Sequence, residues 1–209
     1  MSGPETRELP MFPLGSVLFP GTGIPLQVFE PRYKALTGWC LEHDGALGIV
    51  LIERGSEVGG GDVRFRVGTQ GRITQSAALP DGRWLIVVAG ERRIRINRWR
   101  GEEPFPRAEV TFLDERPGGT AEVREEIVAK VHRALALKVQ LQEWHEEVAT
   151  PGLDPDPATA GWQAASVGLL TAVDCQRLLE TDSVDERLAA LATLLDEEID
   201  VLALRAAGR

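Results

Sequence analysis

The sequence predicts an α+β protein in two parts, a small β-barrel with one inserted helix followed by an α-helical bundle. Residues 1–118 hold short β-branched and aromatic runs cut by turn signals, as in small barrels. From residue 119 to residue 209 the apolar residues recur every three or four positions, which indicates helices. The charge changes at the same place. Residues 1–119 carry 15 basic and 15 acidic side chains, but residues 120–209 carry 8 and 17, so the second part holds the whole net charge of −9.

The strands of the first part are predicted from its apolar or alternating runs of residues and from the turn signals between them. The turn signal Pro80-Asp81-Gly82 predicts a hairpin that joins the apolar runs on either side of it. Ala89-Gly90-Glu91 predicts a second chain reversal. The runs expected to form strands are 47–52, 63–67, 73–79, 84–89, residues around 94–96 and residues around 110–112.

The helices follow from their end signals. Pro31 fits the first turn of the inserted helix, where its missing N–H costs nothing, and Asp44-Gly45 ends that helix. The pattern Ser183-Val184-Asp185-Glu186 is a capping box that opens a long last helix. The other helices expected in the second part are one from residue 123 to about 148 and two shorter ones at about 162–170 and 175–180, after a proline-rich loop at 150–161.

Composition and motifs exclude several classes of protein. No apolar run approaches the roughly 20 residues that a membrane span needs, and the polar start is not a signal peptide, so we expect a cytoplasmic protein without a membrane partner. Cys40 and Cys175 form no Cys-x-x-Cys pair and are expected to be buried free thiols.

Two stretches resemble the beginnings of enzyme motifs, and both are incomplete. The glycines 59–61 are followed by Asp62 and lack the lysine of a phosphate-binding loop. His145-Glu146-Glu147 begins like a zinc-protease helix, but Ala149 stands where the second histidine is needed. We therefore expect no catalytic residue, no cofactor and no metal, and an unrecognised enzyme remains only as a third hypothesis.

Arginines are concentrated in the predicted barrel. Arg64 and Arg66 share one strand face, and Arg93 and Arg95 share another. If those strands are neighbours, one outer face is basic and could bind an anionic partner such as nucleic acid. The other interpretation is a solvated face whose arginines pair with nearby carboxylates, since the net charge of this part is zero.

Three motifs near the N-terminus form a series: Leu9-Pro10-Met11-Phe12-Pro13-Leu14, then Leu18-Phe19-Pro20-Gly21, then Pro25-Leu26-Gln27-Val28-Phe29-Glu30-Pro31-Arg32-Tyr33. Together they closely resemble the start of the N-terminal, substrate-binding domain of Lon-type proteases. The stretches 79–84 and 90–96, with Glu91, Arg92 and Arg93, resemble a later hairpin of that family. The stretches 176–180 and 186–188 resemble its last two helices, so the resemblance spans residues 9–200.

The resemblance implies a PUA-like β-barrel followed by a helical bundle, and a role in recognising protein substrates. A full Lon protease continues into an ATPase module and a Ser–Lys protease domain, so we expect a stand-alone, non-catalytic member. Within the motif 29–33, Phe29 and Tyr33 can pack inward, Glu30 can accept N–H groups at the helix start, and Arg32 can pair with a carboxylate. The alternative is that these residues contact a partner directly.

The first functional hypothesis is a protein-binding module, an adaptor or regulator linked to proteolysis. It requires an exposed apolar patch or groove, which we expect between barrel and bundle, with Trp99, Phe105 and Trp162 as candidates for its lining. The expected partner is an unfolded or partly folded protein or peptide, or a dedicated folded protein. The second hypothesis is a nucleic-acid-binding protein, against which the net charge of −9 counts. Self-association of the long helices stays open.

Overall fold

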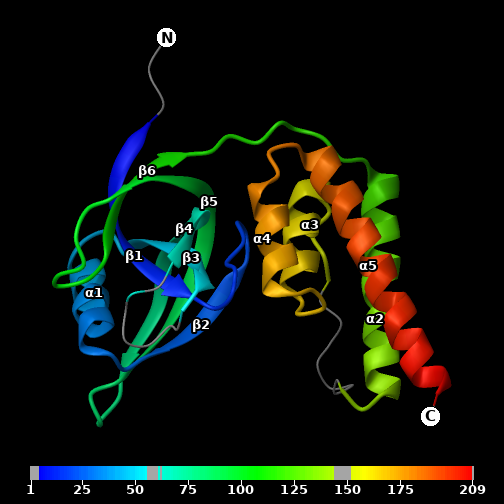
Figure 1. Cartoon of the computed structure of the whole chain (residues 1–209), viewed down its shortest axis with the longest axis horizontal. Coiled ribbons are helices and arrows are strands. Elements are labelled where there is room, and N and C mark those ends of the chain that lie inside the picture. Colours follow the sequence, from blue (N-terminus) through cyan, green and yellow to red (C-terminus); the bar gives the residue numbers. More distant parts are fainter. Residues whose placement is uncertain (1–4, 56–60, 62, 144–151, 209) are drawn as a thin grey trace. The chain divides into compact units, whose positions relative to one another are not determined.

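A computed structural model of the protein divides the chain into two compact units, Met1–Asp114 and Glu115–Arg209 (Figure 1). The residues that it describes are 5–55, 61, 63–143 and 152–208. The first unit contains the strands and one helix, and the second contains helices, so the expected α+β architecture of barrel and bundle is confirmed. The division lies slightly before the expected boundary between residues 118 and 119.

The strands of the first unit form one curled sheet. Their bounds are β1 Thr6–Leu14, β2 Gly23–Val28, β3 Ala46–Arg54, β4 Val63–Ala78, β5 Trp84–Trp99 and β6 Arg107–Phe112. Their order across the sheet is β2-β5-β4-β3-β1-β6. Since β6 also pairs with β5, the strands β5, β4, β3, β1 and β6 close a ring, and β2 lies outside it at the end of the sheet.

The long strands β4 and β5 form the expected hairpin. The turn at residues 80–82 joins them, and Ala78 pairs with Trp84 across it. The expected reversal at Ala89-Gly90-Glu91 is wrong, because β5 continues through these residues. The register against β4 shifts there instead, so that Glu91 is the extra residue of a β-bulge. The first half of β5 therefore pairs with β2 and its second half with β6.

Gly90 allows a loop to cross β5 at close range. A Cβ atom on Gly90 would lie 2.2 Å from the backbone oxygen of Phe19. The same loop receives a hydrogen bond from the Thr69 hydroxyl to the oxygen of Leu18, at 2.5 Å. The loop that leads into β2 is thereby fixed against β4 and β5.

Sequence patterning alone did not predict β1 and β2 as strands, because both contain prolines, which lack the N–H that a sheet ladder uses. β1 pairs with β6 over Thr6–Pro10 and with β3 over Met11–Leu14. Within the described residues, each half of β1 therefore pairs with a neighbouring strand along one edge only. For this reason the missing N–H groups of Pro10 and Pro13 are tolerated.

The inserted helix α1 spans Pro31–Glu42 and begins with Pro31, as expected. Its inward residues Tyr33, Leu36 and Cys40 join a core cluster with residues of β1, β2, β3 and β5. A second cluster, centred on Met11, Ile94 and Val110, fills the other part of the barrel.

The second unit consists of helices α2 Ala121–Gln140, α3 Pro157–Ser166, α4 Ala172–Glu180 and α5 Val184–Ala207. Ser183 caps α5 as expected, with the Glu186 amide donating to its hydroxyl. α2 ends at Gln140, before the expected end near residue 148. The last residues of the expected helix, from 144 on, lie outside the described part of the chain. α3 begins at Pro157, inside the expected loop, because proline suits a first helical turn. Among the described helices, none is both long and apolar enough to cross a membrane.

Candidate polypeptide-binding surface

The corner between β2 and α1 agrees with the expected arrangement at Tyr33 and departs from it at Phe29. Tyr33 packs inward as expected, and its ring stacks on that of Phe12 with the centroids 4.1 Å apart. Phe29, expected to pack beside it, is 52% exposed. Because the chain turns from strand to helix after Val28, whose side chain is buried, Phe29 is directed to the surface.

Glu30 and Arg32 pair with each other at this corner. The Arg32 Nε donates to a Glu30 carboxylate oxygen at 3.2 Å. The carboxylate expected to pair with Arg32 is therefore that of Glu30, only two residues away. The expected capping by the Glu30 side chain is wrong, since that side chain accepts no N–H of the helix start. The backbone oxygen of Glu30 instead accepts from the amides of Tyr33 and Lys34. Of the contacts expected for this motif, the structure therefore contains the inward packing of Tyr33 and the pairing of Arg32 with a carboxylate.

Two adjoining hollows lie along β2 and share Pro25, Leu26 and Gln27. The first encloses about 520 Å³, and the second encloses about 170 Å³. The further lining residues are Gln75, Ser76, Ala77, Leu85, Ile86 and Val87 in the first hollow, and Phe12, Leu14, Val28, Phe29, Glu30 and Tyr33 in the second. We call these two hollows together the β2 surface.

The β2 surface is almost free of charge. Glu30 is the one charged residue among its described lining residues, and its carboxylate is paired with Arg32. Each hollow includes an exposed large apolar side chain, Leu85 at 45% in the first and Phe29 at 52% in the second. Uncharged concave surfaces with exposed apolar side chains favour the binding of apolar groups.

A larger groove on the same unit is strongly charged. It encloses about 1410 Å³ and is lined by Pro31, Arg32, Ala35, Gly61, Val63, Arg64, Arg66, Trp99, Glu102, Glu103 and Pro104. We call it the Arg64 groove. The guanidinium of Arg64 lies 4.3 Å from the ring centroid of Trp99 and pairs with Glu102 at 3.0 Å. One face of Trp99 is therefore covered by a cation.

The apolar patch expected from Trp99, Phe105 and Trp162 is not supported. Phe105 is 4% exposed and belongs to the first core cluster. Trp162 is 3% exposed, with the guanidinium of Arg187 lying 3.6 Å from its ring centroid. Two of the three side chains are buried because large aromatic rings fill core space. The exposed apolar residues Phe29 and Leu85 were not singled out from the sequence as a patch.

The expected basic face does not form from its four candidate arginines. Arg66 and Arg95 are exposed, but the side chain of Arg64 is 6% exposed against Trp99. Arg93 is buried and donates to the backbone oxygen of Asp114 at 2.9 Å. Other arginines of the unit are ion-paired: Arg7 with Asp44, Arg72 with Glu91, Arg83 with Asp81, Arg92 with Glu5, Arg100 with Glu109 and Arg107 with Glu8. This arrangement favours the ion-paired interpretation over a nucleic-acid site.

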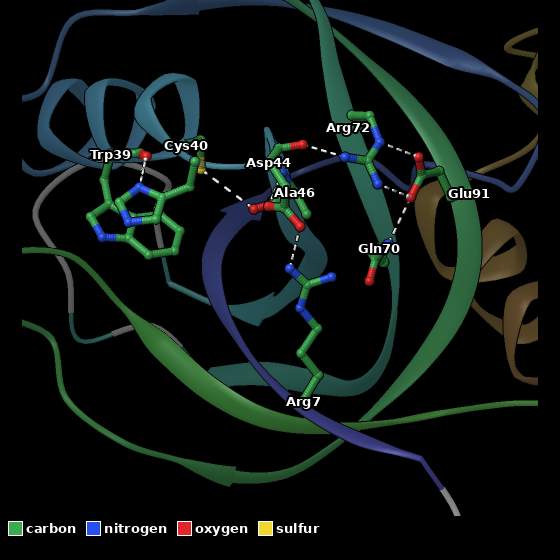
Figure 2. Close-up of polar contacts among 9 residues, drawn as sticks. Arg7, Trp39, Cys40, Asp44, Ala46, Gln70, Arg72 and Glu91 are labelled. Carbon is green, nitrogen blue, oxygen red and sulfur yellow. Dashed lines mark hydrogen bonds and ion pairs between the residues drawn. The ribbon is translucent and has the colours of Figure 1, made fainter.

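A polar network connects β1, the turn after α1, β4 and the bulge of β5 (Figure 2). Arg72 is its centre, donating to Glu91 at 2.6 Å and to the backbone oxygen of Asp44. Arg7 pairs with the carboxylate of Asp44, and the Gln70 amide donates to Glu91 at 2.7 Å. The side chains hold together segments that are far apart in the sequence.

The carboxylates of this network are held in their charged form. The hydrogen bond from Arg7 lowers the pKa of Asp44 below its usual value. Partial burial acts to raise the pKa of Glu91, but hydrogen bonds from Arg72 and Gln70 outweigh it and the pKa is lowered. Next to Glu91 in the resemblance motif, Arg92 lies 4.2 Å from the ring centroid of Phe112. Glu91 and Arg92 therefore both contact side chains of neighbouring strands.

Both cysteines are free and buried, as expected. Burial raises the pKa of Cys40 to about 12 and that of Cys175 to about 11, so neither is a thiolate at neutral pH. In the described ranges, no group of three or more His, Cys, Asp or Glu side chains is placed to hold a metal ion.

The comparisons with known proteins give one family. The model of the ATP-dependent protease La (LON) substrate-binding domain matches residues 8–197. Lon protease 2 of Herpetosiphon aurantiacus is 30% identical over 98% of this chain, and Lon protease of Escherichia coli K12 is 31% identical over 95%. The chain covers 25% and 26% of those two relatives, about a quarter of their length.

Solved structures show the same fold. The Lon N-terminal domain protein from Xanthomonas campestris is 28% identical, with a TM-score of 0.62 over 90% of this chain and 98% of that one. The N-terminal domain of Mycobacterium avium complex Lon protease is 20% identical, with a TM-score of 0.63 over 91% and 98%, which shows the fold alone. With the family model matching nearly the whole sequence, this chain belongs to the Lon substrate-binding domain family.

Proposed function

We propose that this chain is a non-catalytic recognition module that binds unfolded or partly folded polypeptide, and that it serves as an adaptor or regulator of proteolysis in the cytoplasm. The observation that carries the proposal is the β2 surface, two adjoining hollows with exposed Phe29 and Leu85 and no unpaired charge among their described lining residues.

Such a surface favours unfolded over folded proteins. A folded protein buries most of its large apolar side chains, whereas an unfolded chain exposes them in every segment. Transfer of an apolar side chain from water to a concave apolar site gains roughly 25 cal/mol per Å² of buried apolar surface. Because this driving force does not depend on charge, the binding should tolerate salt.

The relatives support the proposal without extending it to catalysis. They are named Lon proteases, and the matched family model is that of their substrate-binding domain. Since the chain covers about a quarter of those relatives, cleavage and ATP hydrolysis are not part of the proposed function. A module of this kind would hold a client polypeptide for a separate protease, or withhold it.

The test is fluorescence anisotropy with labelled α-lactalbumin that has been reduced and alkylated with iodoacetamide, so that it cannot refold. The protein is titrated into this probe at low and at high salt, with native α-lactalbumin as the folded control. We expect saturable binding of the unfolded probe at both salt concentrations and much weaker binding of the native one. Absence of binding at both would contradict the proposal and leave a dedicated folded partner to be sought. Binding at low salt alone would point to the arginines instead.

A further inference from the structure

β2 is an edge strand. It pairs with β5 along its whole length, Gly23 with Ala89 through Val28 with Trp84. Within the part of the chain that the structure describes, no other strand pairs with it. Its second edge therefore presents backbone N–H and C=O groups that take part in no sheet ladder.

The register shows which residues face that edge. The Gly90 amide donates to the backbone oxygen of Thr22 at 2.8 Å, just before β2 begins. Since hydrogen-bonded and non-hydrogen-bonded pairs alternate in an antiparallel ladder, Ile24, Leu26 and Val28 direct their backbone groups toward β5. Gly23, Pro25 and Gln27 then face the open edge. Pro25 fits this assignment, because proline has no N–H to give to β5.

The open edge lacks the protection that edge strands usually have. Charged side chains commonly prevent such edges from pairing with other chains. The sequence of β2, Gly-Ile-Pro-Leu-Gln-Val, contains no charged residue, whereas every other strand of the sheet contains at least one. Pro25 is the one blocking residue, and it leaves donors at Gly23 and Gln27 and acceptors at all three outward positions.

The smaller hollow lies beside this edge. It is lined by core-facing side chains of β2, Leu26 and Val28, and by Phe12 and Leu14 of β1. Its 170 Å³ suits a single large apolar side chain rather than a whole strand. A strand added to β2 would direct every second side chain toward the core side of the sheet, where this hollow lies.

We propose that an extended, uncharged segment of the client polypeptide binds as an added strand along the open edge of β2. Backbone hydrogen bonds to Gly23, Pro25 and Gln27 hold the segment, and an apolar side chain enters the hollow beside Leu26. We choose an uncharged client segment because the edge of β2 has no charged residue. Glu30, at the end of the hollow, is neutralised by Arg32. This inference rests on the proposed function and adds its binding mode.

The first test alters the edge of the protein. Gln27→Pro removes one outward N–H and leaves the pairing with β5 intact, since Leu26 before it is already extended. Gln27→Ala keeps the N–H and is the matched control. The probe is a short fluorescein-labelled peptide of alternating leucine and serine. We expect Gln27→Pro to bind it about tenfold more weakly than Gln27→Ala, as for the loss of one hydrogen bond. Equal affinities would overturn the added strand.

The second test alters the backbone of the peptide. Two versions carry N-methyl groups on alternate residues, one set on the leucines and the other on the serines. An added strand directs the N–H groups of only one set toward β2, so one version should lose at least about tenfold in affinity and the other should bind nearly as well as the parent. Equal losses, or no loss in either version, would overturn the added strand while the proposed function survives.

Binding of the peptide without N-methyl groups distinguishes failure of the binding mode from failure of the proposed function. If neither this peptide nor unfolded α-lactalbumin binds, the proposed function fails together with the binding mode. If sedimentation shows a dimer that Gln27→Pro dissociates and the peptide does not bind, the edge serves a second copy of the chain, and the client-strand proposal is overturned.

Discussion

The β2 surface and the Arg64 groove lie on the same unit and differ in what lines them. The Arg64 groove is the larger, at about 1410 Å³ against about 520 and 170 Å³. Its lining contains three arginines and two glutamates, whereas Glu30 is the one charged residue lining the β2 surface. On the proposed function, the charge of the lining residues rather than the volume of the hollow decides which of the two surfaces binds unfolded polypeptide.

The two surfaces differ in the free energy needed to remove water from their lining residues when a client binds. An apolar client that enters the Arg64 groove must displace water from charged groups, and that water is not replaced by equivalent hydrogen bonds. The stack of Arg64 on Trp99 would also have to open before the indole could contact a client. On the β2 surface, Leu85 and Phe29 are already exposed to solvent and their burial is favourable.

The largest effect is expected from a charge placed on the β2 surface. In Leu85→Asp, a bound apolar segment would cover an unpaired carboxylate, which costs several kcal/mol. We expect affinity for unfolded α-lactalbumin to fall by roughly a hundredfold. Arg66→Asp in the Arg64 groove is the matched control and should bind like the unaltered protein. The comparison fails if the two variants lose affinity equally, measured by anisotropy with far-ultraviolet circular dichroism as the check of folding.

A second test asks whether the support of β2 matters. Gly90→Ala places a Cβ atom 2.2 Å from the oxygen of Phe19, so the loop before β2 must shift. We expect a loss of roughly 2–3 kcal/mol in the free energy of unfolding.

The matched control for that variant is Gly38→Ala in α1, where a Cβ atom would meet no atom within 4 Å. It should be stabilising by about 0.5–1 kcal/mol, because alanine is the better helix former. Urea unfolding measures both variants. A Gly90→Ala protein as stable as the unaltered one would show that the loop crossing is not tight.

The Arg64 groove should matter for stability rather than for client binding. Arg64→Ala removes the stack on Trp99 and the pair with Glu102. We expect a loss of about 1–2 kcal/mol in the free energy of unfolding, because the Arg64 side chain is largely buried. Affinity for the unfolded probe should not change. A drop in affinity at unchanged stability would show that the client contacts this groove.

The smallest effect concerns acid stability. The pKa of Glu91 is lowered on folding, so its contribution is fully present above the usual carboxyl value of 4.5 and is lost as the pH falls through the lowered pKa. Glu91→Gln should be less stable than the unaltered protein at neutral pH by about 1 kcal/mol or less, since the pair is partly exposed. Urea unfolding at several pH values should show this difference shrinking in acid. A difference independent of pH would contradict the ion pairing of the polar network.

The sequence predicted the elements that depend on local signals. The Pro80-Asp81-Gly82 turn, the start of α1 at Pro31 and the Ser183 cap are each decided by a few neighbouring residues, and all three are confirmed. The order of barrel and bundle was readable because period and charge change together near residue 119.

What depends on distant contacts was not predictable. Pro10, Pro13 and Pro25 argue against strands locally, and only the pairing with β3, β5 and β6 makes β1 and β2 strands. Gly90 looks like a turn residue, but it is there because the Phe19 backbone passes over it.

The candidate surface was missed for the same reason. Leu85 belongs to the continuous apolar run 84–88. In the structure Leu85 is exposed while Ile86 and Val88 are buried, but a run of apolar residues does not reveal which side chains face the solvent. Conversely, Phe105 and Trp162 looked available for contact because their burial depends on residues far away in the sequence.

The most direct measurement is a map of backbone amide shifts by nuclear magnetic resonance, with unfolded α-lactalbumin added to the isotope-labelled protein. The account predicts that the amides of residues 23, 24, 26–29 and 84–87 shift on binding, and that those of residues 63–66 and 99–103 in the Arg64 groove do not. Shifts confined to the Arg64 groove, with β2 unaffected, would contradict the assignment of client binding to the β2 surface.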